Sequence, residues 1–373
     1  MLKKTLTTLA IIIAILVAGY QLIGGLPGLV GIVLPDFPDY PAPTTALAED
    51  SEGLLYFSSS TPFDLDVILR DPTQAIPTTA KATLFMPQEA SASAPVPAIV
   101  LLHGSGGITP GREMEYGQQL ADNGYAALVI DYYEPRGATG ATPYMLRVIS
   151  ITEFDALADG YGGLKILRTH PAIDPSRIGI MGFSYGGMAS RFAMDDRIRA
   201  AFMGSEPGFA LYVDYYGPCF QNLQSATLST GPVLTLRGDD DASNDLAACK
   251  LREAQLRDLG AEVSAYIFPG AGHAWEAKKT RALSEDSPYL QGCEMAYDES
   301  GLPMVEGNYI ISPAVNTPRA ERIALRMTSG TALKHCVRYG YIVGRDDNTK
   351  ALSDEIMLGF LRDKFGSTDA KGG

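Results

Sequence analysis

Strand-like and helix-like segments alternate along the middle of the 373-residue chain. Short runs rich in apolar residues predict strands at 98–102, 125–130, 177–181, 200–203, 233–236 and 263–268. The first two runs are apolar throughout, as in strands buried on both faces. Segments with helical periodicity predict helices at 112–123, 152–169, 182–194, 243–259 and 354–365. Because strands and helices alternate, the pattern predicts an α/β fold with a mostly parallel sheet and helices on both faces.

Residues 283–340 interrupt this alternation. Two strand-like pieces there flank the turn sequence Asp-Glu-Ser-Gly at 298–301, which predicts a β-hairpin. We therefore expect an insertion between the last strand and the last helix of one catalytic domain, residues 51–366. Residues 367–373 are expected to form a flexible tail.

The N-terminal segment is apolar from Leu6 to Leu34 and follows Lys3 and Lys4. A short basic stretch before an apolar core is typical of an export signal. The run is also long enough to cross a bilayer, which takes about 20 residues. Residues 1–34 are therefore predicted to be a signal peptide or, if uncleaved, a membrane anchor. Both alternatives place the domain outside the cytoplasm, for example in a periplasm, behind a stiff proline-rich linker at 35–50.

Charge and cysteine content narrow the possible functions. The net charge is −13 and lysine and arginine form no cluster, which excludes nucleic acid as an expected partner. The four cysteines are an even number in an exported chain, which predicts disulfides in one of three pairings. Their spacing matches no zinc motif, so no metal is expected.

The strongest chemical signal is the sequence Gly-Phe-Ser-Tyr-Gly at 182–186, directly after a predicted strand. A G-x-S-x-G sequence between a strand and a helix is the nucleophile elbow, which makes Ser184 the candidate nucleophile. The turn is so tight that side chains at positions 182 and 186 would collide with neighbouring chain, so glycine is expected at both.

A serine nucleophile needs a base, and the chain has only four histidines. His273 follows the last predicted strand, where loops of an open α/β sheet form sites, and it comes after Ser184 in the required order. The other three have different expected places: a strand end for His103, an exposed helix end for His170 and the insertion for His335.

The acid that orients the histidine is expected between these two residues. Asp239, Asp240 and Asp241 all follow the predicted strand at 233–236, and spacing alone leaves the three open. Those not used by the site are expected to be solvated or to cap the helix beginning near Ser243.

A glycine-rich segment, His-Gly-Ser-Gly-Gly at 103–107, follows an early strand and lacks the spacing of a nucleotide-binding loop. It predicts an oxyanion hole formed by the main-chain N–H groups of Ser105 and Tyr185. Three further residues are candidates for the substrate pocket: Tyr132, Arg136 and Trp275. For the two aromatic rings the alternative is core packing. For Arg136 a structural ion pair is the favoured alternative. This chemistry requires no cofactor.

With these motifs placed, residues 81–361 resemble the dienelactone-hydrolase-like branch of the α/β-hydrolases. The matching stretches are LLHGSGG at 101–107, DYYEPRG at 131–137, DPSRI at 174–178, GFSYGG at 182–187, YYGPC at 215–219, GDDD at 238–241 with Cys249, and PGAGHAW at 269–275. The resemblance implies the α/β-hydrolase fold. It also implies that Asp241 is the acid, because the acid stands three residues after the glycine in that pattern.

The chain departs from the family pattern in two ways. Ser184 stands where the dienelactone-cleaving members resemble a cysteine-nucleophile version of the site, and the exported N-terminus differs from that of a cytoplasmic catabolic enzyme. Both departures argue against dienelactone as the substrate. Beside the family motifs we also expect two disulfides, one near the site and one closing the insertion: Cys219 with Cys249, and Cys293 with Cys336.

The expected function is therefore hydrolysis of small carboxylic-ester-like substrates through an acyl-enzyme on Ser184. A serine peptidase of the same fold is the first alternative, because it would share the three residues. A catalytically inert, membrane-tethered binding protein is the second, and the presence of all three residues argues against it. Substrate identity and oligomeric state are not encoded in these motifs.

Overall fold

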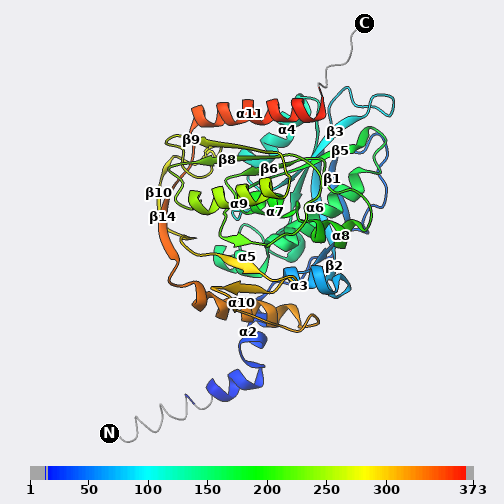
Figure 1. Cartoon of the computed structure of the whole chain (residues 1–373). Helices are drawn as coiled ribbons and strands as arrows, with labels where there is room; N and C mark the ends of the chain where they lie inside the picture. Colours follow the sequence, from blue (N-terminus) through cyan, green and yellow to red (C-terminus); the bar gives the residue numbers. More distant parts are fainter. Residues whose placement is uncertain (1–12, 14–15, 367–373) are drawn as a thin grey trace, which may run out of the picture.

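A single large sheet forms the centre of the protein (Figure 1). The computed structural model describes residue 13 and residues 16–366. In spatial order, the eight strands of this sheet are β1 (Gly53–Thr61), β2 (Ile76–Phe85), β4 (Ala126–Asp131), β3 (Val96–Leu102), β5 (Ile173–Phe183), β6 (Tyr212–Tyr215), β8 (Val233–Gly238) and β9 (Val263–Phe268). β2 is antiparallel to both neighbours and the remaining pairs are parallel. This is the α/β-hydrolase fold, as predicted.

Helices cover both faces of the sheet. The strand β3 illustrates why, since all its residues from Pro97 to Leu102 are buried. Ile99 and Leu101 belong to one apolar core, while Val100 and Leu102 belong to the other. The first core includes residues of α4 (Glu115–Asp122) and α11 (Asp347–Phe365), and the second includes residues of α6 (Glu153–Leu167), α7 (Tyr185–Phe192) and α8 (Asp196–Met203).

The remaining elements of the catalytic domain lie between these strands and helices along the chain. They are α3 (Leu65–Arg70), η1 (Pro72–Gln74), η2 (Pro110–Met114), η3 (Glu134–Arg136), α5 (Tyr144–Ser150), β7 (Gln221–Asn222) and α9 (Leu246–Asp258). The helix α5 lies between β4 and α6 in sequence and contacts the insertion.

The insertion contains the predicted hairpin and more. Its elements are β10 (Ala282–Leu290), β11 (Met295–Tyr297), β12 (Pro303–Val305), β13 (Asn308–Tyr309), α10 (Arg319–Leu333) and β14 (Val337–Val343). β11 and β12 form the hairpin, and Asp298 closes its turn by accepting from the N–H groups of Ser300 and Leu302 at 2.9 Å each. The pairing of β10 with β14 and the helix α10 were not predicted.

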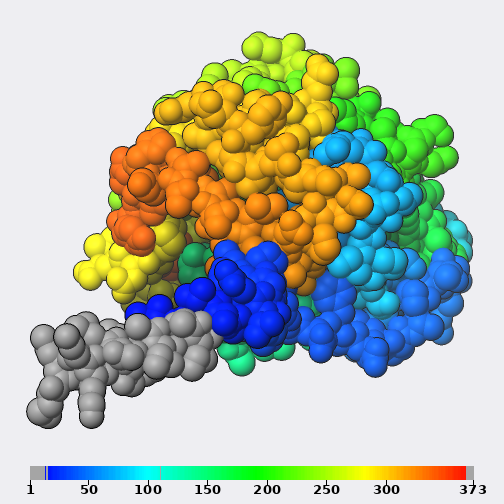
Figure 2. Space-filling model, turned by 90° about the horizontal axis from the view of Figure 1, so that it is seen from below, coloured from blue at the N-terminus to red at the C-terminus, as the bar shows by residue number. Residues whose placement is uncertain are grey.

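The N-terminal helix α2 (Gly25–Val33) packs against the insertion. Val30 shares a small apolar core with Ile323 and Ala324 of α10, and Ile149 of α5 packs against it. Figure 2 shows the dark blue N-terminal segment seated against the orange insertion. Lys3, Lys4 and much of the predicted apolar run, like the predicted tail 367–373, lie outside the described residues.

The described part of the N-terminal segment is broken by a bend. Within it, no single helix has the length and apolar character to cross a bilayer, but Leu16–Leu22 and Gly25–Val33 meet that test together, bent by 76°. The following residues, 35–50, contact the catalytic domain. Tyr40 donates to Glu134 at 3.1 Å, and buried Leu47 donates its N–H to Thr169 at 2.9 Å.

Several element predictions need correction. Residues 200–203 are the end of helix α8 rather than a strand, and the sheet strand of this region is β6. A short apolar run suits a buried strand and one face of a helix equally well, so periodicity could not separate them. The helix expected from Ser243 begins at Leu246, capped by Asp245, and the last helix begins at Asp347.

Candidate active site

Ser184 lies at the turn between β5 and α7. Its φ of 53° and ψ of −112° are unusual for a residue with a side chain, and such strain persists only where surrounding structure imposes it. A Cβ atom at Gly182 would overlap the carbonyl of Gly186, and one at Gly186 would overlap the carbonyl of Leu102. The two glycines are therefore required by the turn, as the sequence predicted, and they hold Ser184 at the carboxyl end of the strand.

Three predicted residues from different loops meet at this turn. His273 Nε2 lies 2.9 Å from Ser184 Oγ, and His273 Nδ1 lies 2.7 Å from Asp241 Oδ2. An ionised carboxylate only accepts hydrogen bonds, so Nδ1 carries the proton and Nε2 accepts from the serine. This geometry is the one expected of a candidate serine nucleophile, its base and the acid that orients the base.

The surroundings of Asp241 keep it ionised. Burial alone raises the pKa of this carboxyl, but the charge of His273 and hydrogen bonds from His273, Ser243 and Asn244 outweigh burial and lower the pKa below its usual value. Ser243 Oγ donates to Asp241 at 2.5 Å and Asn244 Nδ2 donates at 2.8 Å. Neither supporting residue was identified from the sequence.

The two neighbouring aspartates have other contacts. Asp239 accepts from the main-chain N–H of Gly270 at 2.6 Å, and Asp240 forms a surface ion pair with Arg281 at 2.7 Å. Spacing had left the three aspartates open, and the structure places only Asp241 against the imidazole of His273.

The glycine-rich segment at 103–107 lies beside the nucleophile. Ser105 and Tyr185, the predicted oxyanion donors, both line the cavity at Ser184. Beneath the segment, Tyr132 Oη donates to the carbonyl of His103 at 2.9 Å, and Tyr133 Oη donates to that of Ser105 at 3.1 Å. The hydroxyls of Tyr132 and Tyr133 thus hold the glycine-rich segment in place.

The side chain of Tyr185 is fixed by a buried polar group. Its hydroxyl donates to Glu153 at 2.5 Å, and Glu153 also accepts from Gln221 at 2.6 Å. Arg326 of the insertion helix α10 lies 3.4 Å from the same carboxylate. The residue that follows the nucleophile is therefore tied to both the catalytic domain and the insertion.

None of the three candidate pocket residues lines the cavity at Ser184. Tyr132 and Trp275 are fully buried, and Trp275 donates to Ser353 at 3.0 Å within the core. Arg136 makes a buried two-fold ion pair with Asp159, at 2.7 and 3.0 Å. The alternatives of core packing and a structural ion pair hold, because all three side chains are buried and their polar groups are bound within the protein.

The cavity at Ser184 has a volume of about 250 Å³. Its wall combines Tyr144, Met145 and Val148 of α5 with residues of the paired strands β10 and β14. Sequence reasoning missed this wall. The apolar residues within 144–149 could have indicated a buried or substrate-facing element, because they belong to no predicted strand or helix. Nothing in the neighbouring sequence indicated which surface they cover.

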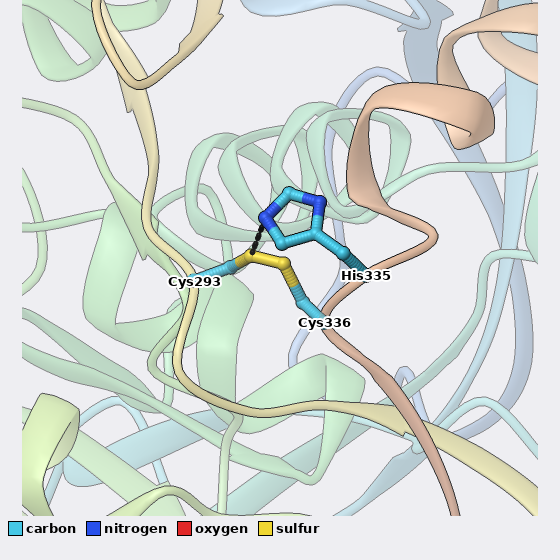
Figure 3. A group of neighbouring side chains, drawn as sticks. All are labelled: Cys293, His335 and Cys336. Atoms are coloured by element: carbon cyan, nitrogen blue, oxygen red, sulfur yellow. Dashed lines mark hydrogen bonds between the residues drawn. A yellow bond between two sulfur atoms is a disulfide. The ribbon is translucent and has the colours of Figure 1, made fainter.

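Both predicted disulfides are present: Cys219 is joined to Cys249, and Cys293 to Cys336. His335 Nε2 lies 3.5 Å from Cys293 Sγ (Figure 3). These three residues group their potential ligand atoms as a metal site would, but in this structure both sulfur atoms are bonded to each other. The fourth histidine, His170, is buried rather than exposed and accepts from the N–H of Ala172 at 3.1 Å.

Comparison with known proteins shows the family of this chain. A model of the dienelactone hydrolase family matches residues 81–300, so the chain belongs to that family. It is 26% identical over 163 residues to a probable 2-oxo-3-(5-oxofuran-2-ylidene)propanoate lactonase of Bradyrhizobium sp, covering 42% of this chain and 64% of the relative. It is 23% identical over 227 residues to the uncharacterized peptidase YuxL of Bacillus subtilis, covering 51% of this chain and 33% of that protein.

The chain thus spans between a third and two thirds of the length of these curated relatives. Among solved structures, a putative dienelactone hydrolase from Klebsiella pneumoniae is similar with a TM-score of 0.43 and 20% sequence identity, covering 60% of this chain and 88% of that one.

Proposed function

We propose that this protein is a serine hydrolase that cleaves small carboxylic esters outside the cytoplasm. The observation that carries the proposal is the pair of hydrogen bonds linking Ser184, His273 and Asp241, at 2.9 and 2.7 Å. Family membership supports hydrolysis as the reaction class. The serine at the nucleophile position, where dienelactone-cleaving members resemble a cysteine version of the site, and the apolar cavity favour simple esters over dienelactone as the substrate.

The reaction proceeds in two steps. Ser184 Oγ attacks the ester carbonyl carbon while its proton passes to His273 Nε2, and the alcohol leaves with that proton. Water then attacks the acyl-enzyme with His273 as base, which releases the carboxylic acid and restores the serine. Asp241 holds the imidazole and stabilises its positive charge. The N–H groups of Ser105 and Tyr185 bind the oxyanion in both steps.

Export is proposed on two observations. Disulfides persist mainly in oxidising compartments, and the described residues contain two. The helix α2 exposes Leu29, Ile32 and Val33, which suits an apolar N-terminal segment that signals export or remains in a membrane. The proposed partners are accordingly a small ester and, if the segment is uncleaved, a bilayer.

The test is ester hydrolysis together with fluorophosphonate labelling of the wild type and the Ser184→Ala variant. The variant is expected to lose at least about 10⁴-fold in kcat/KM and all labelling. Ser93→Ala, at an exposed loop position, is the matched control and should behave as the wild type. Equal activity of the wild type and Ser184→Ala would contradict the proposal.

A peptidase activity is the second candidate, favoured by the similarity to YuxL. Comparing the cleavage rates of an ethyl ester and an anilide of the same acyl group distinguishes an esterase from a peptidase. Faster cleavage of the anilide would make the peptidase the better description, since amides are intrinsically less reactive.

A further inference from the structure

The walls of the cavity at Ser184 carry no formal charge. No Lys, Arg, Asp or Glu occurs among the described residues that line it. Its polar groups are those of the reaction centre, such as Ser105 and His273, and tyrosine hydroxyls. Everything else that the cavity presents to a bound acyl group is apolar, including Met145, Val148 and Phe220.

Three arginines near this region bind other groups of the protein. Arg136 is paired with Asp159 in the core. Arg147 donates to the carbonyl of Gly106 at 3.2 Å and lies over the ring of Tyr133. Arg326 faces Glu153. Among the described residues that line the cavity, a substrate carboxylate would therefore meet no lysine or arginine side chain.

The insertion supplies one part of the cavity wall through the strands β10 and β14. Leu290 at the end of β10 is directly opposite Val337 at the start of β14, and both line the cavity with Tyr341. The disulfide between Cys293 and Cys336 closes this end of the two strands. Leu290 and Val337 are therefore held in place beside the reacting serine.

We infer that the β10–β14 wall makes this site selective for esters of small, uncharged acyl groups and excludes acyl groups that carry a carboxylate. This inference rests on the proposed function and names the substrate class of the same site. Its physical basis is that burying a charge without a partner is costly, whereas apolar contact in a cavity is favourable. A volume of about 250 Å³ is below the range of roughly 300–1,000 Å³ that is usual for ligand pockets, which favours a small acyl group.

The test compares ethyl 4-methylpentanoate with monoethyl succinate. The two esters share the leaving group and nearly the same shape, and they differ in whether the acyl chain ends in two methyl groups or in a carboxylate. Acid release by the wild type, followed by pH-stat, is expected to favour the neutral ester by at least about 100-fold in kcat/KM. Comparable rates for the two esters would overturn the inference.

A charge-restoring variant makes the test specific to the wall. Val337→Arg is expected to reduce the preference at least about tenfold by raising turnover of monoethyl succinate, because the guanidinium pairs with the carboxylate. Val337→Met enlarges the same side chain without charge and should keep the preference. Leu290→Arg, on the opposite strand, repeats the test if Val337→Arg fails to fold. An unchanged preference in folded arginine variants would show that this wall does not select the substrate.

Fluorophosphonate labelling of Ser184 distinguishes a failure of the proposed selectivity from a failure of the proposed function. If Ser184 reacts with a fluorophosphonate and both esters are cleaved equally, the selectivity is wrong while the serine hydrolase stands. If neither ester is cleaved and Ser184 does not react, the proposed function is wrong and this inference falls with it.

Discussion

The main-chain N–H of His273 donates to the carbonyl oxygen of Ile342 at 2.7 Å. Ile342 belongs to β14, the strand that also contributes Val337 and Tyr341 to the cavity. The carbonyl of His273 accepts in turn from the N–H of Gly344 at 2.9 Å. The insertion therefore supports the proposed base at one end of β14 and the substrate wall along the rest of it.

The contact between Asp241 and His273 predicts how an amide substitution will act. Asp241→Asn keeps the shape of the side chain but loses the charge that orients and stabilises the imidazole. We expect kcat to fall by about 10³–10⁴-fold, with a smaller change in KM, in assays on a neutral ester. Asp240→Asn removes only the surface ion pair with Arg281 and should stay within about twofold of the wild type. Similar losses in both variants would mean that Asp241 has no special role.

The elbow glycine Gly186 predicts a steric effect. A Cβ atom there would overlap the carbonyl of Leu102, so Gly186→Ala must displace the turn that carries Ser184. We expect a loss of stability of about 1–3 kcal/mol and at least about 100-fold lower activity. Gly140→Ala, at an exposed loop position, is the control, since no described atom outside its chain neighbours lies within 4 Å of the added carbon. The measurements are thermal unfolding and ester hydrolysis, and an active Gly186→Ala enzyme would contradict the argument.

The disulfide between Cys293 and Cys336 predicts an effect on substrate binding. Replacing both cysteines by serine frees the ends of β10 and β14 at the pair Leu290 and Val337. We expect stability to fall by about 2–5 kcal/mol and KM for a neutral ester to rise about tenfold. kcat should change less, because Ile342 holds His273 at the other end of β14. A kcat loss without a KM change would show that the wall is not the part affected.

The docking of α10 predicts a pH dependence of stability. Asp64 and Asp66 both pair with the single guanidinium of Arg322, at 2.8 and 2.7 Å. Burial raises the pKa of Asp64 from 3.8 to about 6, and the hydrogen bond and charge of Arg322 only partly offset this. Between about pH 4 and about pH 6 the folded chain therefore binds more protons than the unfolded chain at Asp64. Because of this difference, Asp64 lowers the free energy of unfolding as the pH rises through that window.

The neutral variant Asp64→Asn should lack this contribution. Its stability relative to the wild type is expected to increase by on the order of 1–3 kcal/mol across the same window and to stay constant above it. Urea unfolding at several pH values between 4 and 8 provides the measurement. Asp258→Asn, at an exposed position on α9, should follow the wild-type curve. Parallel curves for Asp64→Asn and the wild type would contradict the prediction.

Much of the fold and the reaction centre could be predicted because the signals are local. The buried strands read as continuous apolar runs, and the elbow around Ser184 is specified by consecutive residues. The scarcity of histidine made His273 the candidate base by elimination. Asp241, by contrast, was selected by resemblance, because three adjacent aspartates are equivalent until the loop geometry is known.

What could not be predicted depends on which distant segments meet. Residues 200–203 carry the apolar character of a strand but end a helix, since the chain only enters the sheet afterwards, at β6. Trp275 lies within a family motif close to the site in sequence, yet its side chain is buried in the core, whereas the structural ion pair of Arg136 was the favoured interpretation of the sequence. No pattern along the chain states the direction of a buried side chain at such positions.

The chain's local pattern thus established a serine elbow, a histidine after the last strand and an α/β fold around them. Tertiary structure decided which aspartate faces His273 and which residues surround the substrate. The reason is physical: a turn is governed by the sterics of neighbouring residues, whereas the cavity wall requires Leu290 and Val337 to be brought together by strand pairing and closed by a disulfide. Those contacts are long-range, so their consequence for the substrate appears only in the folded protein.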